Sequence, residues 1–170
     1  TTYDLINTVD VRTGKTQLAS ILASGVSFCL ILTSTNDQPA GLTATQSIAN
    51  LTTIIAALKN VGIVPIIIAE MPRGDSVNTG TRLSGANLPQ HIQVYRWILS
   101  LQNPYSGVIV ADVWPTLAQY DSTFGDAIVG MLYDGLHPGP LAAYYMAQAV
   151  IAATNGYVGK SYPLMSSQAD

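Results

Sequence analysis

The chain has 170 residues, of which 48% are apolar and only 10% are charged. Soluble domains usually contain about 25% charged residues, so this composition excludes intrinsic disorder and fits one domain with a substantial core. Seven basic residues are spread along a chain of net charge −3, which argues against a nucleic-acid partner, and the single cysteine, Cys29, excludes an internal disulfide.

Apolar, β-rich runs alternate with helical patterns, which predicts an α/β domain of three layers built on a parallel sheet. In chain order, we expect strands over Tyr3–Val11, Val26–Thr33, Ile63–Glu70 and Gly107–Val113. We expect helices over Thr16–Ser24, Thr43–Asn60, Asn87–Leu101 and Pro138–Ala153. The domain should cover residues 1–155, followed by a loosely held tail over residues 156–170.

Two of these elements carry stronger signals than the others. Thr43 and Gln46 have capping-box spacing at the start of the second expected helix, Thr43–Asn60, and Gly62 is placed to end that helix. The run Val26–Thr33 is continuously apolar, as in a strand that is covered on both faces. By contrast, the first expected strand is weak and polar, so a further strand missing before Thr1 would explain the pattern.

The surface composition bears on location. The longest apolar runs are far shorter than the roughly 20 residues of a membrane-spanning helix, so no membrane partner is expected. Ser, Thr, Asn and Gln outnumber the charged residues. This favours an extracellular or virion-associated protein, such as a phage-tail domain. Thr1 is not an initiator methionine and no signal peptide is evident, so we expect a processed chain or a piece of a longer one.

Candidate chemistry lies after the strands, because sites in open α/β sheets form at the carboxyl ends of strands. Asp134-x-x-His137 precedes the last helix, and a histidine held by a carboxylate can act as a general base. Asn36 follows the second strand, where its amide could donate to an oxyanion. Gly14 is expected to open a helix, so its backbone N–H could donate in the same way.

In chain order, the segments that contain Gly14, Asn36 and Asp134-x-x-His137 resemble the second, third and last conserved sequence blocks of the SGNH/GDSL hydrolase superfamily. The run Leu30 to Gln38 (LILTSTNDQ) is similar to the family's third block, with Ser34 where a glycine is usual, and Val11 replaces a usual glycine in the second block. The resemblance implies a flavodoxin-like sheet and serine ester hydrolysis without a metal or other cofactor. It also implies that His137 is the base, that Asp134 orients it, and that Asn36 and Gly14 are oxyanion donors.

The family's first block, a Gly-Asp-Ser that carries the nucleophile, does not precede Tyr3. Gly74-Asp75-Ser76 has the same letters but lies after a later strand, and we interpret it as coincidence with Ser76 as a minor alternative. The serine is therefore expected on a companion segment or chain. The substrate would be a small ester or an O-acetylated polysaccharide. The alternative is a non-catalytic carbohydrate-binding or structural virion domain.

Other residues have weaker indications of function. Arg73, Arg82, Trp114 and Tyr133 are candidates for substrate contact, although packing is the better expectation for Trp114. Gly14-Lys15-Thr16 is weakly similar to a phosphate-binding loop, but Val9 stands where that loop needs glycine. Two histidines and one cysteine give no metal-ligand spacing, and His91 is expected to be solvated or capped on its helix.

Overall fold

Three parallel strands form the central sheet of the computed structural model, which describes residues 1–32, 34–83, 85–103, 105–120 and 125–155. The strands are β3 (Phe28–Ile31), β4 (Val64–Ile68) and β5 (Ile109–Ala111), in the order β3-β4-β5. Each pair is parallel, which confirms the predicted sheet type. Parallel pairing places the carboxyl ends of all three strands at one edge.

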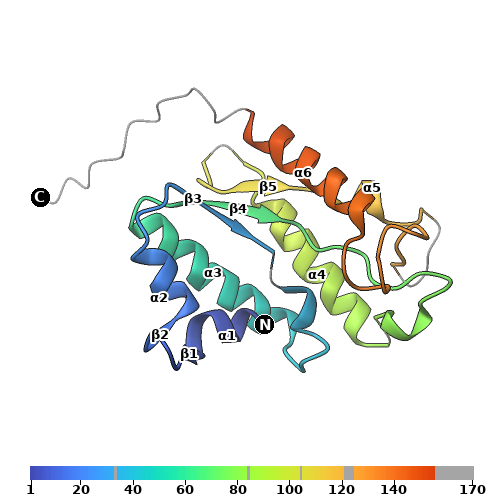
Figure 1. Ribbon diagram of the computed structural model, residues 1–170, viewed down its shortest axis with the longest axis horizontal. Coiled ribbons are helices and arrows are strands. Elements are labelled where there is room, and N and C mark those ends of the chain that lie inside the picture. The colour runs from blue at the N-terminus through green and yellow to red at the C-terminus, as the bar shows by residue number, and fades with distance from the viewer. Residues whose placement is uncertain (33, 84, 104, 121–124, 156–170) are drawn as a thin grey trace, which may run out of the picture.

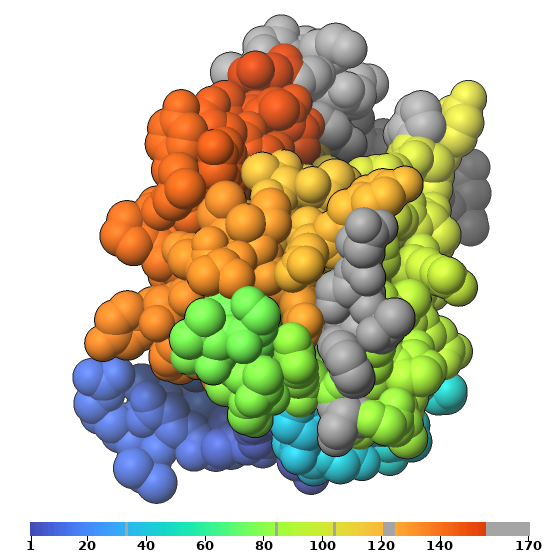
Figure 2. All heavy atoms as spheres, turned by 90° about the vertical axis from the view of Figure 1, so that its right-hand side faces the viewer, coloured from blue at the N-terminus to red at the C-terminus, as the bar shows by residue number. Residues whose placement is uncertain are grey.

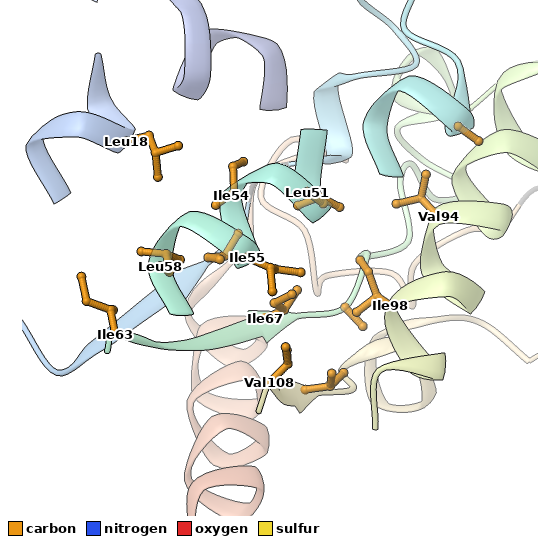
Figure 3. Packing of buried hydrophobic residues seen from close by; sticks show 14 residues of the cluster. Leu18, Leu51, Ile54, Ile55, Leu58, Ile63, Ile67, Val94, Ile98 and Val108 are labelled. Atoms are coloured by element: carbon orange, nitrogen blue, oxygen red, sulfur yellow. The ribbon is translucent and has the colours of Figure 1, made fainter. Parts of the chain in front are cut away.

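Helices cover both faces of this sheet and complete the three predicted layers (Figure 1). On one face lie α3 (Ala44–Asn60) and α4 (Asn87–Ser100), and on the other lies α6 (Pro140–Thr154). Neighbouring residues of β4 point to opposite faces, so Ile67 joins the core beneath α3 and α4 while Ile68 joins the core beneath α6. Figure 3 shows the first of these cores.

The strongest local signal was confirmed. Thr43 caps α3 by accepting a hydrogen bond from the N–H of Gln46, whose side chain accepts in return from the Thr43 backbone. Gly62 has a φ of +79°, a conformation that ends the helix and turns the chain into β4.

The beginning of the chain differs from the prediction. Instead of a strand over Tyr3–Val11, the structure has α1 (Thr2–Asn7), followed by a short hairpin of β1 (Val9–Asp10) and β2 (Lys15–Thr16) and by α2 (Gln17–Leu22). Thr1 and Asp4 form a reciprocal capping box that starts α1. A Thr-x-x-Asp pattern is a helix-start signal, and it outweighs the weak alternation of the following residues.

The edge position of β3 corrects a second prediction. Phe28 and Leu30 are 52% and 56% exposed, although a strand covered on both faces was expected. Within the described residues β3 pairs with β4 alone, so one of its long sides has no neighbouring strand. The hydrophobic run predicted the strand correctly, but burial on both faces also requires neighbouring segments, and β3 lies at the edge of the described sheet.

Short elements complete the description. Two single-turn helices, η1 (Ser34–Asn36) and η2 (Thr79–Thr81), follow β3 and β4, and α5 (Trp114–Leu117) follows β5. The predicted tail over residues 156–170 lies outside the described residues. Among those that are described, no helix is long and apolar enough to cross a membrane.

Candidate active site

The Asp134–His137 turn forms the pair that its spacing predicted. Nδ1 of His137 lies 2.8 Å from Oδ2 of Asp134, and Oδ1 accepts the backbone N–H groups of Leu136 and His137 at 3.0 and 2.8 Å. These hydrogen bonds, the backbone N–H of His137 above all, lower the pKa of Asp134 to about 2. An ionised carboxylate only accepts, so in the neutral imidazole Nδ1 carries the proton and Nε2 carries the lone pair.

Glycine is required inside this turn. Gly135 has a φ of +78°, and a Cβ there would lie 2.2 Å from Oγ1 of Thr81 and 2.5 Å from Cβ of Asn78. The backbone N–H of Tyr133 also donates to the carbonyl of His137 at 2.7 Å, which closes the turn just before α6. The Tyr133 ring is 84% exposed beside this turn, so it is available to a ligand.

Asn36 lies in η1, at the carboxyl end of β3, as predicted. Its side chain is exposed and makes no hydrogen bond with a described residue. The residues on either side of Asn36 are held by hydrogen bonds to buried groups. Ser34 Oγ donates to Oε1 of Glu70, and the carboxylate of Asp37 accepts the N–H and the hydroxyl of Thr2 at 2.8 and 2.6 Å. A free amide on an anchored turn suits an oxyanion donor.

The segment after β4 joins these two blocks. Nη1 of Arg73 donates to the carbonyl of Thr35 at 2.6 Å, and the next N–H, that of Gly74, donates to the carbonyl of Gly135 at 2.6 Å. Consecutive residues therefore hold the Asn36 turn and the His137 turn at the same edge of the sheet. In Figure 2 the green segment after β4 lies between the cyan segment after β3 and the orange segment that contains the His137 turn.

The contacts of the segment after β4 change the interpretation of Arg73 and Arg82. Arg73 is buried, with its guanidinium directed at the η1 backbone. Arg82 forms a two-point ion pair with Asp126, at 2.8 and 2.6 Å. Both side chains were weak candidates for substrate contact, and the structure engages each of them with another segment of the protein. Their observed contacts position loops of the site.

Gly14 is placed differently from the prediction. It lies in the β1–β2 hairpin rather than at the start of a helix, and α2 is capped instead by Thr16. The N–H of Gly14 donates to the carbonyl of Asp10 at 2.8 Å. That amide is therefore occupied, and the antiparallel hairpin also lacks the strand–loop–helix arrangement of a phosphate-binding loop.

Gly74-Asp75-Ser76 lies closer to the candidate site than its sequence position indicated, since Gly74 is bonded to the Asp134–His137 turn. Asp75 is buried and its Oδ1 accepts the N–H groups of Val77 and Asn78 at 2.8 and 2.6 Å, so its carboxylate shapes the loop. Ser76 is exposed. No hydrogen bond joins Ser76 to His137 among the interactions of the described residues.

A buried acid–base pair beneath the site was missed by sequence reasoning. Glu70 and His91 are 2% and 0% exposed, and Oε2 of Glu70 lies 3.6 Å from Nδ1 of His91. Burial, assisted by the nearby Asp37 charge, raises the pKa of Glu70 to about 8, and burial lowers the pKa of His91 to about 4. The pair is therefore uncharged at neutral pH.

The expectation that His91 is solvated was wrong. His91, Val94 and Ile98 follow one face of α4, and all three are buried. Nε2 of His91 lies 2.9 Å from the carbonyl of Met71, and its ring contacts that of Trp114 at a centroid separation of 6.0 Å. The helical spacing to Val94 and Ile98 was the signal that would have identified His91 as inward-facing. Trp114 also packs on Tyr95, which supports packing over sugar contact.

Comparison with known proteins adds information about the fold. No family model and no curated protein matches the sequence. Solved structures do match. A GDSL-like lipase from Bacteroides thetaiotaomicron VPI-5482 has a TM-score of 0.62 at 13% identity, over 76% of this chain and 62% of that one. A lipolytic protein of the G-D-S-L family from Desulfitobacterium hafniense DCB-2 has a TM-score of 0.61 at 15% identity, over 79% and 69%.

The structure of TesA covers more of the chain, with a TM-score of 0.59 at 15% identity over 88% of this chain and 74% of that one. The present chain spans about 62% of the length of the Bacteroides lipase. These matches confirm the predicted three-layer, flavodoxin-like architecture of the SGNH/GDSL type. At this identity they establish the fold alone, and the chemistry has to be argued from the site.

Proposed function

We propose that this chain supplies the base, the orienting acid and an oxyanion donor of a serine ester hydrolase. The observation that carries the proposal is the Asp134–His137 pair with its 2.8 Å contact. Its Nε2 and the Asn36 amide, at the same sheet edge, make no hydrogen bond to any described residue. The likeness of the fold to GDSL-type lipases supports the same assignment.

The nucleophile in this proposal is a serine on a segment outside the present sequence. Its Oγ attacks the ester carbonyl carbon while Nε2 of His137 takes the hydroxyl proton, and the Asp134 carboxylate stabilises the imidazolium. The Asn36 amide donates to the oxyanion of the tetrahedral intermediate. Collapse expels the alcohol, which receives the proton from His137. Water then attacks the acyl-serine by the same route and releases the acid.

The substrate we propose is an O-acetylated polysaccharide, with a small ester as the simpler case. The support is a neutral surface rich in hydroxyl and amide side chains and the exposed Tyr133 ring beside His137. Exposed aromatic rings pack well against sugar faces. The same composition favours an extracellular or virion-associated location.

A second candidate function is carbohydrate binding or a structural virion role without catalysis. It is favoured by one observation: no hydroxyl or thiol of a described residue is hydrogen-bonded to His137. The two candidates differ in whether a reactive serine ever reaches Nε2.

Intact-mass analysis after fluorophosphonate treatment separates them. The protein is labelled together with any chain that copurifies. An adduct on a companion serine, lost in His137→Ala and retained in the exposed-residue control Tyr105→Ala, is the expected result. An adduct on Ser76 would place the nucleophile within this chain. No adduct on folded protein that copurifies with a serine-containing chain would contradict the enzyme assignment and favour the binding function.

A further inference from the structure

Glu70 is a buried acid in contact with the turn that carries Asn36, and no step of the proposed reaction uses it. Its side chain is 2% exposed and lies just past the carboxyl end of β4. The N–H of the preceding residue, Ala69, donates to the carbonyl of Ala111 at 2.9 Å, so the backbone beside Glu70 is still paired with β5. The Glu70 side chain therefore projects from the sheet, whereas Asn36 lies in the short η1 turn.

The contacts of Glu70 reach both sides of Asn36. Two positions before Asn36, the hydroxyl of Ser34 donates to Oε1 of Glu70. One position after Asn36, the buried carboxylate of Asp37 is near enough for its charge to act on Glu70. One end of the turn is thus attached to Glu70 by a hydrogen bond, and the residue at the other end would be repelled by an ionised Glu70.

The hydrogen-bond partners around Glu70 indicate where its proton lies. Nε2 of His91 is 2.9 Å from the carbonyl of Met71, which can only accept, so Nε2 carries the ring hydrogen and Nδ1 carries the lone pair. Oε2 of Glu70 lies 3.6 Å from that Nδ1, and neither atom has a hydrogen-bond partner among the described residues. Because Oε1 already accepts from Ser34, the carboxyl proton belongs on Oε2, facing the lone pair of His91.

The charges around Glu70 favour this neutral form. Within the described part of the chain, the titratable groups that face it are Asp37 after η1, Arg73 after β4 and His91 on α4. Burial and the Asp37 charge raise the pKa of Glu70 to about 8, although Arg73 opposes the shift. With Glu70 neutral, the Asp37 carboxylate and the Arg73 guanidinium balance each other. Ionisation would add a second buried carboxylate against a single guanidinium.

We propose that Glu70 is a positioning residue for Asn36 and acts in its neutral form. The protonated side chain anchors Ser34 and exerts no repulsion on Asp37, so the turn between them holds the Asn36 amide at the edge of the sheet. Loss of the Oε2 proton to solvent leaves a buried anion that repels Asp37 and displaces the turn. The role of Asn36 as oxyanion donor rests on the proposed function, whereas the coupling of Glu70 to the turn does not.

The same residues do not form a second catalytic triad. Ser34, Glu70 and His91 supply a hydroxyl, a carboxyl and an imidazole, but the hydroxyl donates to the carboxyl rather than to a ring nitrogen. All three side chains are also buried, so a substrate does not reach them. Their contacts are those of a support for the turn.

The test follows Glu70 and Asn36 separately by NMR on the intact chain. Glu70 is the single glutamate, so glutamate labelled with ¹³C at Cδ gives one carboxyl signal. Its pH titration is compared with that of the ¹⁵N-labelled side-chain amide of Asn36. We expect the two signals to move together, with a common midpoint at about pH 8. In Glu70→Gln, which stays neutral, the Asn36 signal should keep its low-pH position throughout.

Two serine variants separate the anchor from the general loss of a buried hydroxyl. Ser34→Ala removes the bond to Glu70, so it should displace the Asn36 signal at low pH and reduce its movement with pH. Ser47→Ala is the matched control, because Ser47 is also buried but its hydroxyl accepts from Gln38, at 3.3 Å. It should reproduce the parental titration.

Three results would overturn the proposal. The first is an Asn36 signal that does not move at the Glu70 midpoint, and the second is one that moves equally in Glu70→Gln. The third is a Glu70 midpoint near the ordinary value of 4.5, because the side chain would then be ionised at neutral pH. The parental titration and Ser34→Ala decide the question even if Glu70→Gln does not fold.

Ester hydrolysis by the protein together with the chain that supplies the serine distinguishes this inference from the proposed function. We expect kcat to fall above about pH 8, by up to about 10²–10³-fold, the loss seen when one oxyanion donor is removed, and KM to change little. Glu70→Gln should abolish this fall. Coupled NMR titrations without hydrolysis would support the positioning of Asn36 and contradict the hydrolase. Hydrolysis with uncoupled titrations would support the hydrolase and overturn the positioning role.

Discussion

At the scale of single residues, Asp134 combines two roles that substitution can separate. One oxygen accepts two backbone N–H groups and builds the turn, while the other faces Nδ1 of His137. An asparagine keeps an oxygen for the backbone but loses the negative charge opposite the ring. The turn would therefore survive while the base loses its orienting anion.

We expect Asp134→Asn to leave the fold unchanged and to lower kcat of ester hydrolysis by about 10⁴-fold, the size seen for the equivalent change in a serine protease triad. Steady-state kinetics of ester hydrolysis by the protein together with the chain that supplies the serine measure the loss. Amide NMR shifts of Leu136 and His137 report whether the turn is intact. A variant with parental kcat would show that the Asp134 charge has no part in the reaction.

The buried Glu70–His91 pair predicts an unusual pH profile of stability. Folded Glu70 keeps its proton up to a pKa of about 8, against 4.5 as the ordinary value, so its contribution to stability falls as pH rises from about 4.5 to 8. Folded His91 stays neutral down to about 4, against 6.5, so its contribution falls as pH drops from about 6.5 to 4.

These slopes oppose each other between about pH 4.5 and 6.5, where stability should be nearly flat, and it should decline from 6.5 to 8 by about 1.4 kcal/mol per unit at most. Glu70→Gln removes the decline and leaves a rise from pH 4 to 6.5. Urea unfolding across this range measures both profiles. A decline above pH 6.5 that persists in Glu70→Gln would assign it to another group.

At the scale of elements, the Asp134–His137 turn depends on the glycine that follows Asp134. Gly135 has a positive φ, and Thr81 and Asn78 on the loop after β4 leave no room there for a Cβ. Its carbonyl also accepts the Gly74 N–H. The turn is therefore held by the neighbouring loop as well as by its own hydrogen bonds.

We expect Gly135→Ala to destabilise the protein by more than about 1 kcal/mol and to weaken the Asp134–His137 contact, since the added methyl group meets Thr81. Gly80→Ala is the control, because its Cβ would meet nothing within 4 Å. Chemical denaturation gives the stability change, and histidine NMR reports the contact. Equal stability of the two variants would show that the loop with Asn78 and Thr81 moves to accommodate the methyl group without a loss of unfolding free energy.

At the scale of the whole molecule, one buried carboxylate connects the start of the chain to the site. Asp37 follows Asn36 directly and accepts the N–H and the hydroxyl of Thr2, the first residue of α1. The Thr2 hydroxyl in turn accepts from Asn50 on α3 at 3.0 Å. Three segments far apart in sequence thus meet at the residue beside the oxyanion donor.

We expect Thr2→Val to cost roughly 1.5–3 kcal/mol of unfolding free energy, because a buried charge loses a hydrogen-bond donor. Thr8→Val is the matched control, since Thr8 makes a hydroxyl–carboxylate bond to Asp4 at an exposed position. Urea denaturation of both variants measures the difference. Equal losses would show that burial of Asp37 adds nothing to the bond.

Features that depend on near neighbours were predictable from the chain. The α3 capping box, the parallel β/α alternation, and the Asp134–His137 pair need only residues a few positions apart. Periodicity and short-range hydrogen bonding depend only on residues close together in the sequence. The sheet type and the Asp134–His137 part of the site could therefore be predicted from them.

Features that depend on distant neighbours required the tertiary structure. It buried His91 and Glu70 together, engaged Arg73 and Arg82 with other loops, and left β3 at an open edge. Each outcome is decided by groups 20 or more positions away, whose positions depend on the packing of the entire chain. Local patterns indicate which secondary structure a segment prefers. Its burial and its hydrogen-bond partners are decided only when the layers pack together.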